Sequence, residues 1–155
     1  QLLYRLKRDN EFLRSYDEAA AKLPAMPHIA LAKAAFLVRC ERYGEALELY
    51  ERALKLAPGE PSVLSNLGMS YVLTRELPKA EQSLRQAYGS GRADARVRQN
   101  LALVIGLQGR FDEATKVASQ DLPPEQARAN VAYLRSMLSQ PNTWKQLKQA
   151  DRNRG

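Results

Sequence analysis

Few side chains in this 155-residue sequence could perform covalent or acid–base chemistry. There is one histidine, His28, and one cysteine, Cys40. A single cysteine cannot form an internal disulfide or a cysteine-based zinc site, and a single histidine cannot build a multi-histidine metal site. We interpret His28, which follows a proline at an expected helix start, as a capping or surface residue, and Cys40 as a small buried apolar residue. The sequence therefore predicts no enzymatic activity, no metal site and no cofactor.

One short segment superficially resembles a phosphate-binding loop. Residues 89–92 read Gly-Ser-Gly-Arg and precede an expected helix. A true phosphate loop follows a strand and ends in Gly-Lys-Ser or Gly-Lys-Thr, whereas this one follows a helix and lacks that ending. We therefore expect a turn between two helices.

The charge and composition are those of one folded domain. The chain carries 24 Lys+Arg against 17 Asp+Glu, a net charge of +7, and 45% of its residues are hydrophobic. No stretch approaches the roughly 20 apolar residues that a membrane span needs. Residues 145–155 form an expected basic, flexible tail, while the remaining positive charge is spread along the chain. Because a nucleic-acid binder usually concentrates its basic residues on one face, we expect no nucleic-acid partner.

A 34-residue period organises the elements that must position any functional residue. The matching positions, in chain order within each set, are Tyr16/Tyr50/Leu84, Ala19/Ala53/Ala87, Pro24/Pro58, Ala46/Ala80/Ala114, Asn66/Asn100, Leu67/Leu101 and Gly68/Ala102. Several independent registers that agree on one spacing indicate a true internal repeat.

These positions carry the tetratricopeptide (TPR) signature, so the chain resembles that superfamily of helix–turn–helix repeats. The resemblance implies an all-α, right-handed α-solenoid with a C-terminal capping helix, as one TPR domain over residues 1–144. We expect Gly68 and Ala80 where the two helices of one repeat cross, and Ala87 where the next repeat packs. The expected segments are a helical lead-in over 1–26, either continuous or broken near 9–10, then repeats 27–60 (helices near 28–40 and 44–57), 61–94 and 95–122, and a capping helix over 124–139.

The second half of the chain carries a narrower resemblance. It contains, in order, Asn-Leu-Ala at 100–102, Gln-Gly-Arg-Phe at 108–111, Asp-Leu-Pro-Pro-Glu-Gln-Ala at 121–127 and Ser-Gln-Pro-Asn-Thr-Trp at 139–144. This ordered combination resembles the TadD family, the TPR lipoproteins of bacterial tight-adherence (Tad/Flp) pilus assembly.

The TadD resemblance implies a lipoprotein on the periplasmic face of the outer membrane. Its role would be like that of a pilotin, which binds the pilus secretin and aids its assembly or localisation; the alternative is a general scaffold for other Tad/Flp pilus proteins. The lipid anchor of that family is a lipobox cysteine, which Cys40 does not match. Because the sequence begins at Gln1, we expect that cysteine to lie upstream of this fragment.

In a TPR stack the first helix of each repeat lines a concave groove, the usual place for a partner segment. The predicted groove residues are His28, Leu31, Ala35, Val38, Ser65, Asn66, Met69, Val72, Arg96, Gln99, Asn100 and Leu103, with Gly106 at the last inward position. Its apolar residues predict an amphipathic partner helix. The alternative is that the chain's own N-terminal helix, or a neighbouring molecule, fills the groove.

The groove does not match the clamp with which some TPRs bind the acidic C-termini of heat-shock chaperones. That clamp uses charged and amide side chains at five positions, and here Leu31 and Ala35 replace its first pair. Asn66 and Arg96 do fit, and Asn100 occupies the remaining position. We therefore expect no chaperone-tail receptor, and expect the two asparagines to bond a partner backbone or a neighbouring helix.

Overall fold

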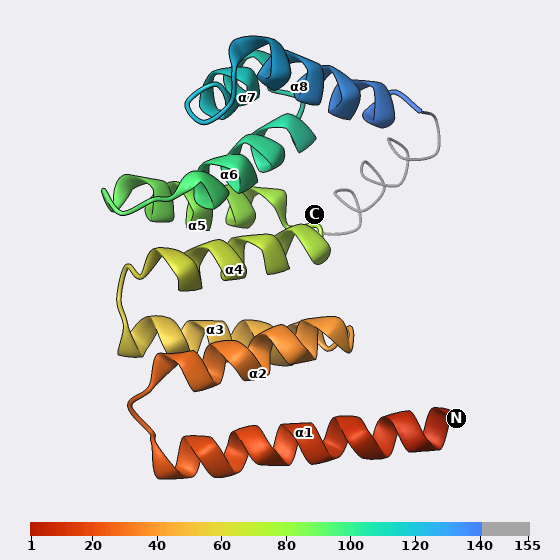
Figure 1. The fold of residues 1–155 in the computed structure, drawn as a ribbon, viewed down its shortest axis with the longest axis vertical. Coiled ribbons are helices and arrows are strands. Elements are labelled where there is room, and N and C mark those ends of the chain that lie inside the picture. The colour runs from red at the N-terminus through yellow and green to blue at the C-terminus, as the bar shows by residue number, and fades with distance from the viewer. Residues whose placement is uncertain (141–155) are drawn as a thin grey trace.

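The computed structural model describes residues 1–140, and the predicted tail at 145–155 and Trp144 lie outside the described residues. Within residues 1–140 the chain forms eight helices joined by short turns, and no strand (Figure 1). The helices are α1 (Leu2–Lys22), α2 (Pro27–Arg39), α3 (Tyr43–Leu56), α4 (Pro61–Leu73), α5 (Leu77–Gly89), α6 (Ala95–Leu107), α7 (Phe111–Ala118) and α8 (Pro124–Leu138).

The helix starts reproduce the 34-residue period. The first helices of the three repeats, α2, α4 and α6, begin at Pro27, Pro61 and Ala95, and their second helices α3, α5 and α7 begin at Tyr43, Leu77 and Phe111. Proline at the first helical position is favoured because its missing N–H has no partner there in any case. The predicted all-α repeat architecture is confirmed.

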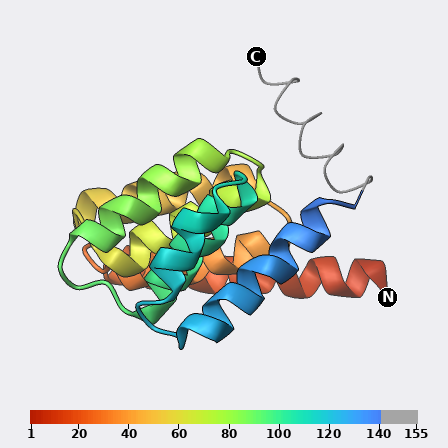
Figure 2. The same ribbon diagram turned by 90° about the horizontal axis from the view of Figure 1, so that it is seen from above.

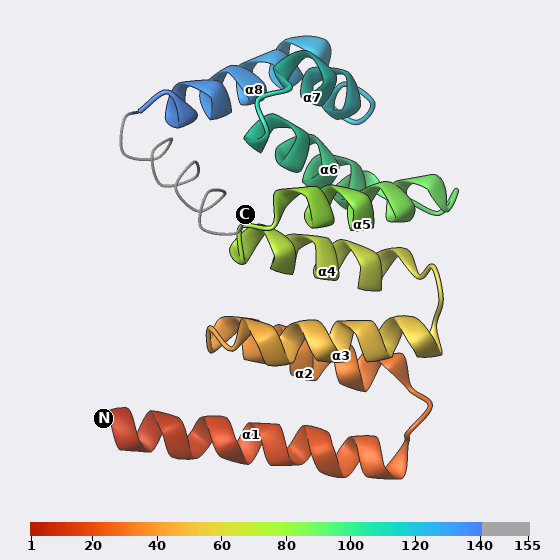
Figure 3. The same ribbon diagram turned by 180° about the vertical axis from the view of Figure 1, so that it is seen from behind.

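The helices pair into hairpins that stack along one direction. Each first helix packs on the second helix of its own repeat, α1 packs on α2 at one end, and α8 packs on α6 and α7 at the other. Figures 1 and 3 show α2 in front of α3 from one side and behind it from the other, so the two lie in different layers. From above, the hairpins overlap along the stacking direction (Figure 2).

Two segments differ in detail from a regular repeat. The lead-in is one continuous helix through residues 9–10, because Asp and Asn cost a helix interior much less than Gly or Pro. In the third repeat, α7 has 8 residues against 14 in α3 and 13 in α5. The shorter α7 brings α8 onto the end of the stack earlier than the period would place another first helix.

Small residues lie where the helices approach most closely. A Cβ added to Gly68 would lie 2.8 Å from the Leu84 Cγ and 3.1 Å from the Ala80 carbonyl oxygen, both on α5. Ala87 is fully buried and contacts a cluster that includes Val97 of the next repeat. The expected roles of these residues in packing are confirmed.

The hydrophobic core is continuous from hairpin to hairpin. Tyr71 packs against both large clusters, one around Leu37 and Tyr50 and the other around Leu84 and Leu101. At the far end α8 packs Ala127 and Val131 against residues of α6 and α7, and Leu138 on the same helix is also buried. This helix therefore acts as the predicted cap, because a solenoid end otherwise leaves apolar surface in water.

Candidate functional site

Residues 1–140 leave one side of the first helices of the repeats uncovered, and we call this side the A-helix face. It comprises four register positions on each of α2, α4 and α6, none of them buried. Its residues are His28, Ala32, Ala35 and Arg39, then Ser62, Asn66, Met69 and Leu73, then Arg96, Asn100, Leu103 and Leu107. Seven of these were predicted to line a concave groove.

One of the predicted groove residues is buried. Ser65 is 1% exposed, and its hydroxyl oxygen accepts a hydrogen bond from the Asn100 Nδ2 at 3.1 Å. The side chain of Ser65 therefore lies in the contact between α4 and α6, and its assignment as a groove residue is wrong. The same bond shows that Asn100 contacts a neighbouring helix, as one of the two expectations for it required.

The inward position assigned to Gly106 is also covered. A Cβ at this residue would lie 2.6 Å from the Leu134 Cδ2, so the glycine faces α8 instead of open solvent. The cap therefore closes this end of the A-helix face.

Four further predicted groove residues are half-buried and pack partly against the hydrophobic core. Leu31 and Val38 pack against the cluster around Leu37, and Met69 and Val72 pack against the cluster around Leu84. Their apolar character therefore serves the fold as well as the surface. Gln99 is exposed beside the A-helix face.

The N-terminal helix packs on α2 and leaves the A-helix face residues of α2 exposed. α1 contacts α2 and no other helix among residues 1–140, with an ion pair of 2.5 Å between the Asp17 carboxylate and the Lys33 Nζ. Because His28, Ala32 and Ala35 on α2 are exposed and α1 contacts neither α4 nor α6, this helix does not fill the groove.

The most exposed large apolar side chain on the A-helix face was not predicted. Leu73 is 50% exposed, compared with 36% for Leu103. It follows Met69 by four residues and lies 34 residues after Arg39. The helical spacing and the 34-residue repeat therefore could have identified Leu73 as a residue of this face. The prediction instead used the position one residue earlier, which holds Val38 and Val72.

His28 and Cys40 lie at the two ends of α2. His28 is exposed at the start of α2, and Cys40 is half-buried at the end of that helix, so it is less buried than expected. The segment 89–92 is a turn between α5 and α6, with Gly91 at a φ of 73°. No group of three His, Cys, Asp or Glu side chains that could hold a metal occurs in the described part of the chain. None of the helices there is long and apolar enough for a membrane span.

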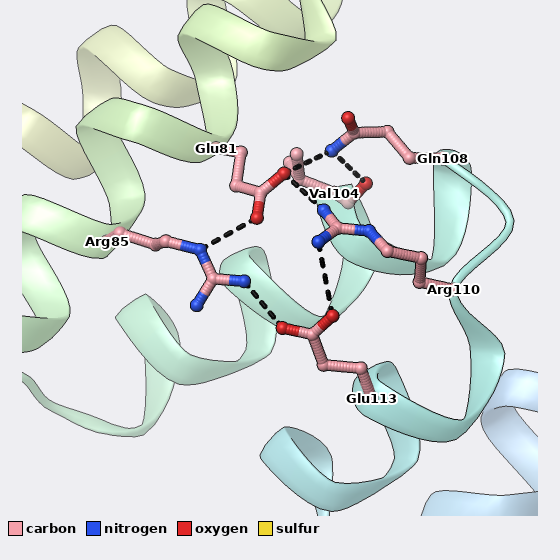
Figure 4. Close-up of polar contacts among 6 residues, drawn as sticks. All are labelled: Glu81, Arg85, Val104, Gln108, Arg110 and Glu113. Carbon is pink, nitrogen blue, oxygen red and sulfur yellow. Dashed lines mark hydrogen bonds and ion pairs between the residues drawn. The ribbon is translucent and has the colours of Figure 1, made fainter.

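A polar network ties the second hairpin to the third (Figure 4). The Glu81 carboxylate on α5 accepts hydrogen bonds from the Arg85 Nε and the Gln108 Nε2, each at 2.7 Å, and from Arg110. Glu113 on α7 accepts from Arg85 at 2.5 Å and from Arg110 at 3.1 Å. Because these groups satisfy one another, the network positions α5 against the α6–α7 turn.

The Glu81 network makes stability depend on pH. Burial acts to raise the pKa of the Glu81 carboxyl, but the hydrogen bonds from Arg85, Gln108 and Arg110 outweigh it and lower that pKa below its ordinary value. The lowered pKa contributes stability that is fully present above the unfolded pKa, about 4.3, and is lost as the pH falls through the folded pKa.

We expect Glu81→Gln to lower the free energy of unfolding at pH 7 by about 1.5–3 kcal/mol, since hydrogen bonds to a charged group are lost. Its loss of stability between pH 7 and pH 3 should be smaller than that of the wild type. Urea unfolding at both pH values measures this. The control Glu48→Gln removes an exposed carboxylate on α3 and should follow the wild type; equal pH dependence in Glu81→Gln would contradict the assignment.

Comparison with known proteins agrees with this architecture. The tetratricopeptide repeat family matches residues 39–104. Human (Homo sapiens) tetratricopeptide repeat protein 7A is 27% identical over 100 residues, which make up 64% of this chain and 12% of that protein. The chain thus matches only a small part of this much longer relative.

Solved structures show the same fold. TTC0263, a thermophilic TPR protein in Thermus thermophilus, superposes with a TM-score of 0.68 at 22% identity over 92% of this chain and 80% of its own. YrrB, a TPR protein with an unusual peptide-binding site, superposes with a TM-score of 0.64 at 20% identity over 96% of this chain and 79% of its own. The hairpins in a 34-residue register and these superpositions show that the described chain has the fold of a TPR helical solenoid.

Proposed function

We propose that this chain is a non-catalytic protein-binding factor that holds a segment of a partner protein on its A-helix face. TPR proteins typically mediate interactions between proteins, and YrrB has a peptide-binding site. The observation that carries the proposal is that one register position places Ala35, Met69 and Leu103 on three successive first helices, none of them buried.

The exposed side chains on this face suit an amphipathic partner helix. Leu73 and Leu103 are the most exposed large apolar residues on α4 and α6, with Met69 half-buried beside them. An amphipathic helix binds such a surface through apolar residues spaced three or four apart. Full burial of an aliphatic side chain contributes about 1.5–3 kcal/mol, so two or three of them give a specific complex.

We propose further that the partner belongs to a Tad/Flp pilus, and that the protein acts like a pilotin on the outer-membrane secretin. The support is the ordered TadD-like combination at 100–102, 108–111, 121–127 and 139–144. In this proposal the protein is held at the periplasmic face of the outer membrane by a lipid anchor on a cysteine upstream of Gln1. The alternative is a scaffold that links other pilus or secretion-system components.

We expect Met69→Asp and Leu103→Asp each to weaken secretin binding about tenfold or more, because a charge placed in an apolar contact must be desolvated. Fluorescence anisotropy with labelled secretin fragments measures the affinity. Leu56→Asp is the matched control, since Leu56 is 48% exposed on a second helix, α3. Wild-type affinity in both groove variants would contradict the proposed face.

Pull-down of separate Tad/Flp components distinguishes the two versions of the proposal. Capture of secretin fragments supports the pilotin-like role, capture of other pilus proteins alone supports the scaffold, and capture of neither contradicts a role in this pilus. Labelling of the full-length precursor with palmitate, followed by separation of inner and outer membranes, tests the proposed anchor and location.

A further inference from the structure

The N-terminal half of α1 extends past the helix on which it packs. α1 has 21 residues and α2 has 13, and the two run in opposite directions (Figures 1 and 3). The longer helix therefore projects beyond the end of α2 by about eight residues, or about 12 Å at the usual helical rise. We call residues 2–9 of α1 the overhang.

An apolar stripe continues from the core onto the overhang. Leu13 is 8% exposed where α1 packs on α2, while Leu6 and Leu2 on the same stripe are 50% and 71% exposed. Leu2 and Leu6 are four residues apart and Leu6 and Leu13 are seven apart, so the three face the same side of the helix. Leu6 and Leu2 are exposed because α2 ends before it can pack against them.

Two cavities flank this helix at its contact with the end of α2. The first, which we call the aliphatic cavity, has a volume of about 320 Å³ and lies between Leu2 and Leu6 of the overhang and the α2–α3 turn at Cys40.

The second, the aromatic cavity, has a volume of about 300 Å³ and is lined by Tyr4, Phe12 and Phe36. The rings of Phe12 and Phe36 lie 5.5 Å apart between their centroids, which holds one wall in place. Both cavities are thus partly apolar and open beside the same helix.

Two arginines line both cavities, and neither is paired with a side chain in the described part of the chain. The guanidinium groups of Arg5 and Arg39 make no hydrogen bond or ion pair with another side chain among residues 1–140. Arg8, at the aromatic cavity, is held over the Tyr4 ring at 5.9 Å from its centroid.

The carboxylates at these cavities are fewer than the arginines. Asp9 lines both cavities and Glu41 lines the aliphatic one, while Arg42 is already paired with Glu45 through two hydrogen bonds of 2.7 Å. Arg5, Arg8 and Arg39 therefore leave a surplus of positive charge, and it is concentrated at the boundary between the two cavities.

We propose that the overhang and its two cavities form a second docking site, which takes a peptide segment of a partner protein that carries a carboxylate beside apolar side chains. An arginine guanidinium binds a carboxylate through two parallel hydrogen bonds, and Arg5 and Arg39 are both available for one. The flanking cavities accept the apolar side chains next to that carboxylate. The site adjoins the A-helix face at Arg39 but depends on residues of α1 that the first proposal does not use.

The probe for this site is a labelled synthetic helix-forming peptide of 15 residues with Glu and Leu on adjacent faces, compared with the same peptide in which every Glu is Gln. We expect the Glu peptide to bind the 155-residue protein, and the Gln peptide to bind about tenfold or more weakly, because a charge-assisted bond to arginine is lost. Fluorescence anisotropy measures both.

The double variant Arg5→Ala/Arg39→Ala should bind the Glu peptide about tenfold or more weakly, whereas the control Arg52→Ala/Arg128→Ala, which removes the same charge from exposed positions elsewhere, should bind like the wild type. Leu2→Ser/Leu6→Ser tests the apolar part and should also weaken binding. Thermal melts by circular dichroism check that all variants fold. Leu103→Asp should leave the Glu peptide bound, which separates this site from the A-helix face.

Several outcomes would overturn the proposal. Equal binding of the Glu and Gln peptides, or wild-type binding by Arg5→Ala/Arg39→Ala, would remove the carboxylate contact. A DNA duplex or phosphatidylglycerol vesicles that bind more tightly through the same arginines would replace the peptide as occupant. A dimer in sedimentation experiments that Leu2→Ser/Leu6→Ser dissociates would assign the site to a second copy of the chain.

Discussion

Leu84→Ala is expected to lower the free energy of unfolding by about 2–5 kcal/mol, in the upper part of that range. Leu84 is fully buried on α5, in the cluster with Leu101 and Ile105. Its neighbour across the helix crossing is Gly68, which has no side chain to move into the vacated space. Because the neighbouring side chains cannot fill the vacated space, the variant loses stability through the cavity as well as through the lost burial of apolar surface.

The control for Leu84 is Leu73→Ala on the adjacent helix. Leu73 is 50% exposed, and truncation of an exposed side chain changes stability by about 0.5 kcal/mol or less. Urea unfolding followed by circular dichroism measures both variants. A cost for Leu84→Ala no larger than for Leu73→Ala would show that the α4–α5 contact is not part of the cooperative core.

Leu84→Ala should also reduce the cooperativity of unfolding. In a stack of repeats each hairpin is stabilised mainly by its neighbours, so a weakened middle hairpin uncouples the two ends. We expect a lower dependence of the free energy of unfolding on urea, or two separated transitions.

The repeat register was predictable because it rests on direct steric requirements. Gly68, Ala80 and Ala87 must be small where helices touch, and that requirement returns every 34 residues. The helix ends of the first repeat, predicted near 28–40 and 44–57, lie within one residue of α2 and α3 for the same reason.

The exposed face was harder to predict because each residue turns the helix by about 100°. An error of one position selected Val72 in place of Leu73 and included Ser65, which lies between two helices. Moreover, equivalent positions have different neighbours: Val38 is half-buried, whereas Gly106 is covered by α8. A repeat pattern alone treats such positions as equal.

The polar network around Glu81 is a second feature that the sequence pattern could not predict. The spacing of Glu81 and Arg85 on one helix is visible in the sequence, but Gln108 and Arg110 come from the next hairpin. Only the packing of α5 against the α6–α7 turn brings these four side chains together. Contacts between repeats depend on how the hairpins are oriented, which the spacing within each hairpin does not specify.

Three glycines on different helices should respond differently to the same added methyl group. Gly68→Ala is expected to lower the free energy of unfolding by about 1–3 kcal/mol, because its Cβ would meet the Leu84 Cγ at 2.8 Å and the Ala80 carbonyl oxygen at 3.1 Å. The backbone oxygen cannot rotate away, so α4 and α5 must separate. The intrinsic preference of alanine for helices offsets at most about 1 kcal/mol of this cost.

Gly106→Ala should cost less than Gly68→Ala although its nearest contact, 2.6 Å, is shorter. That contact is with the Leu134 Cδ2, the end of a flexible side chain on the half-buried face of α8, which can change rotamer.

Gly44→Ala has no atom within 4 Å of its new Cβ and should stabilise α3 by about 0.5–1 kcal/mol. Urea unfolding of the three variants therefore should rank Gly44→Ala above the wild type, then Gly106→Ala, then Gly68→Ala. If Gly106→Ala lowers the free energy of unfolding as much as Gly68→Ala does, α8 packs on α6 as rigidly as the two helices of one hairpin pack on each other. The cap is then an integral part of the solenoid.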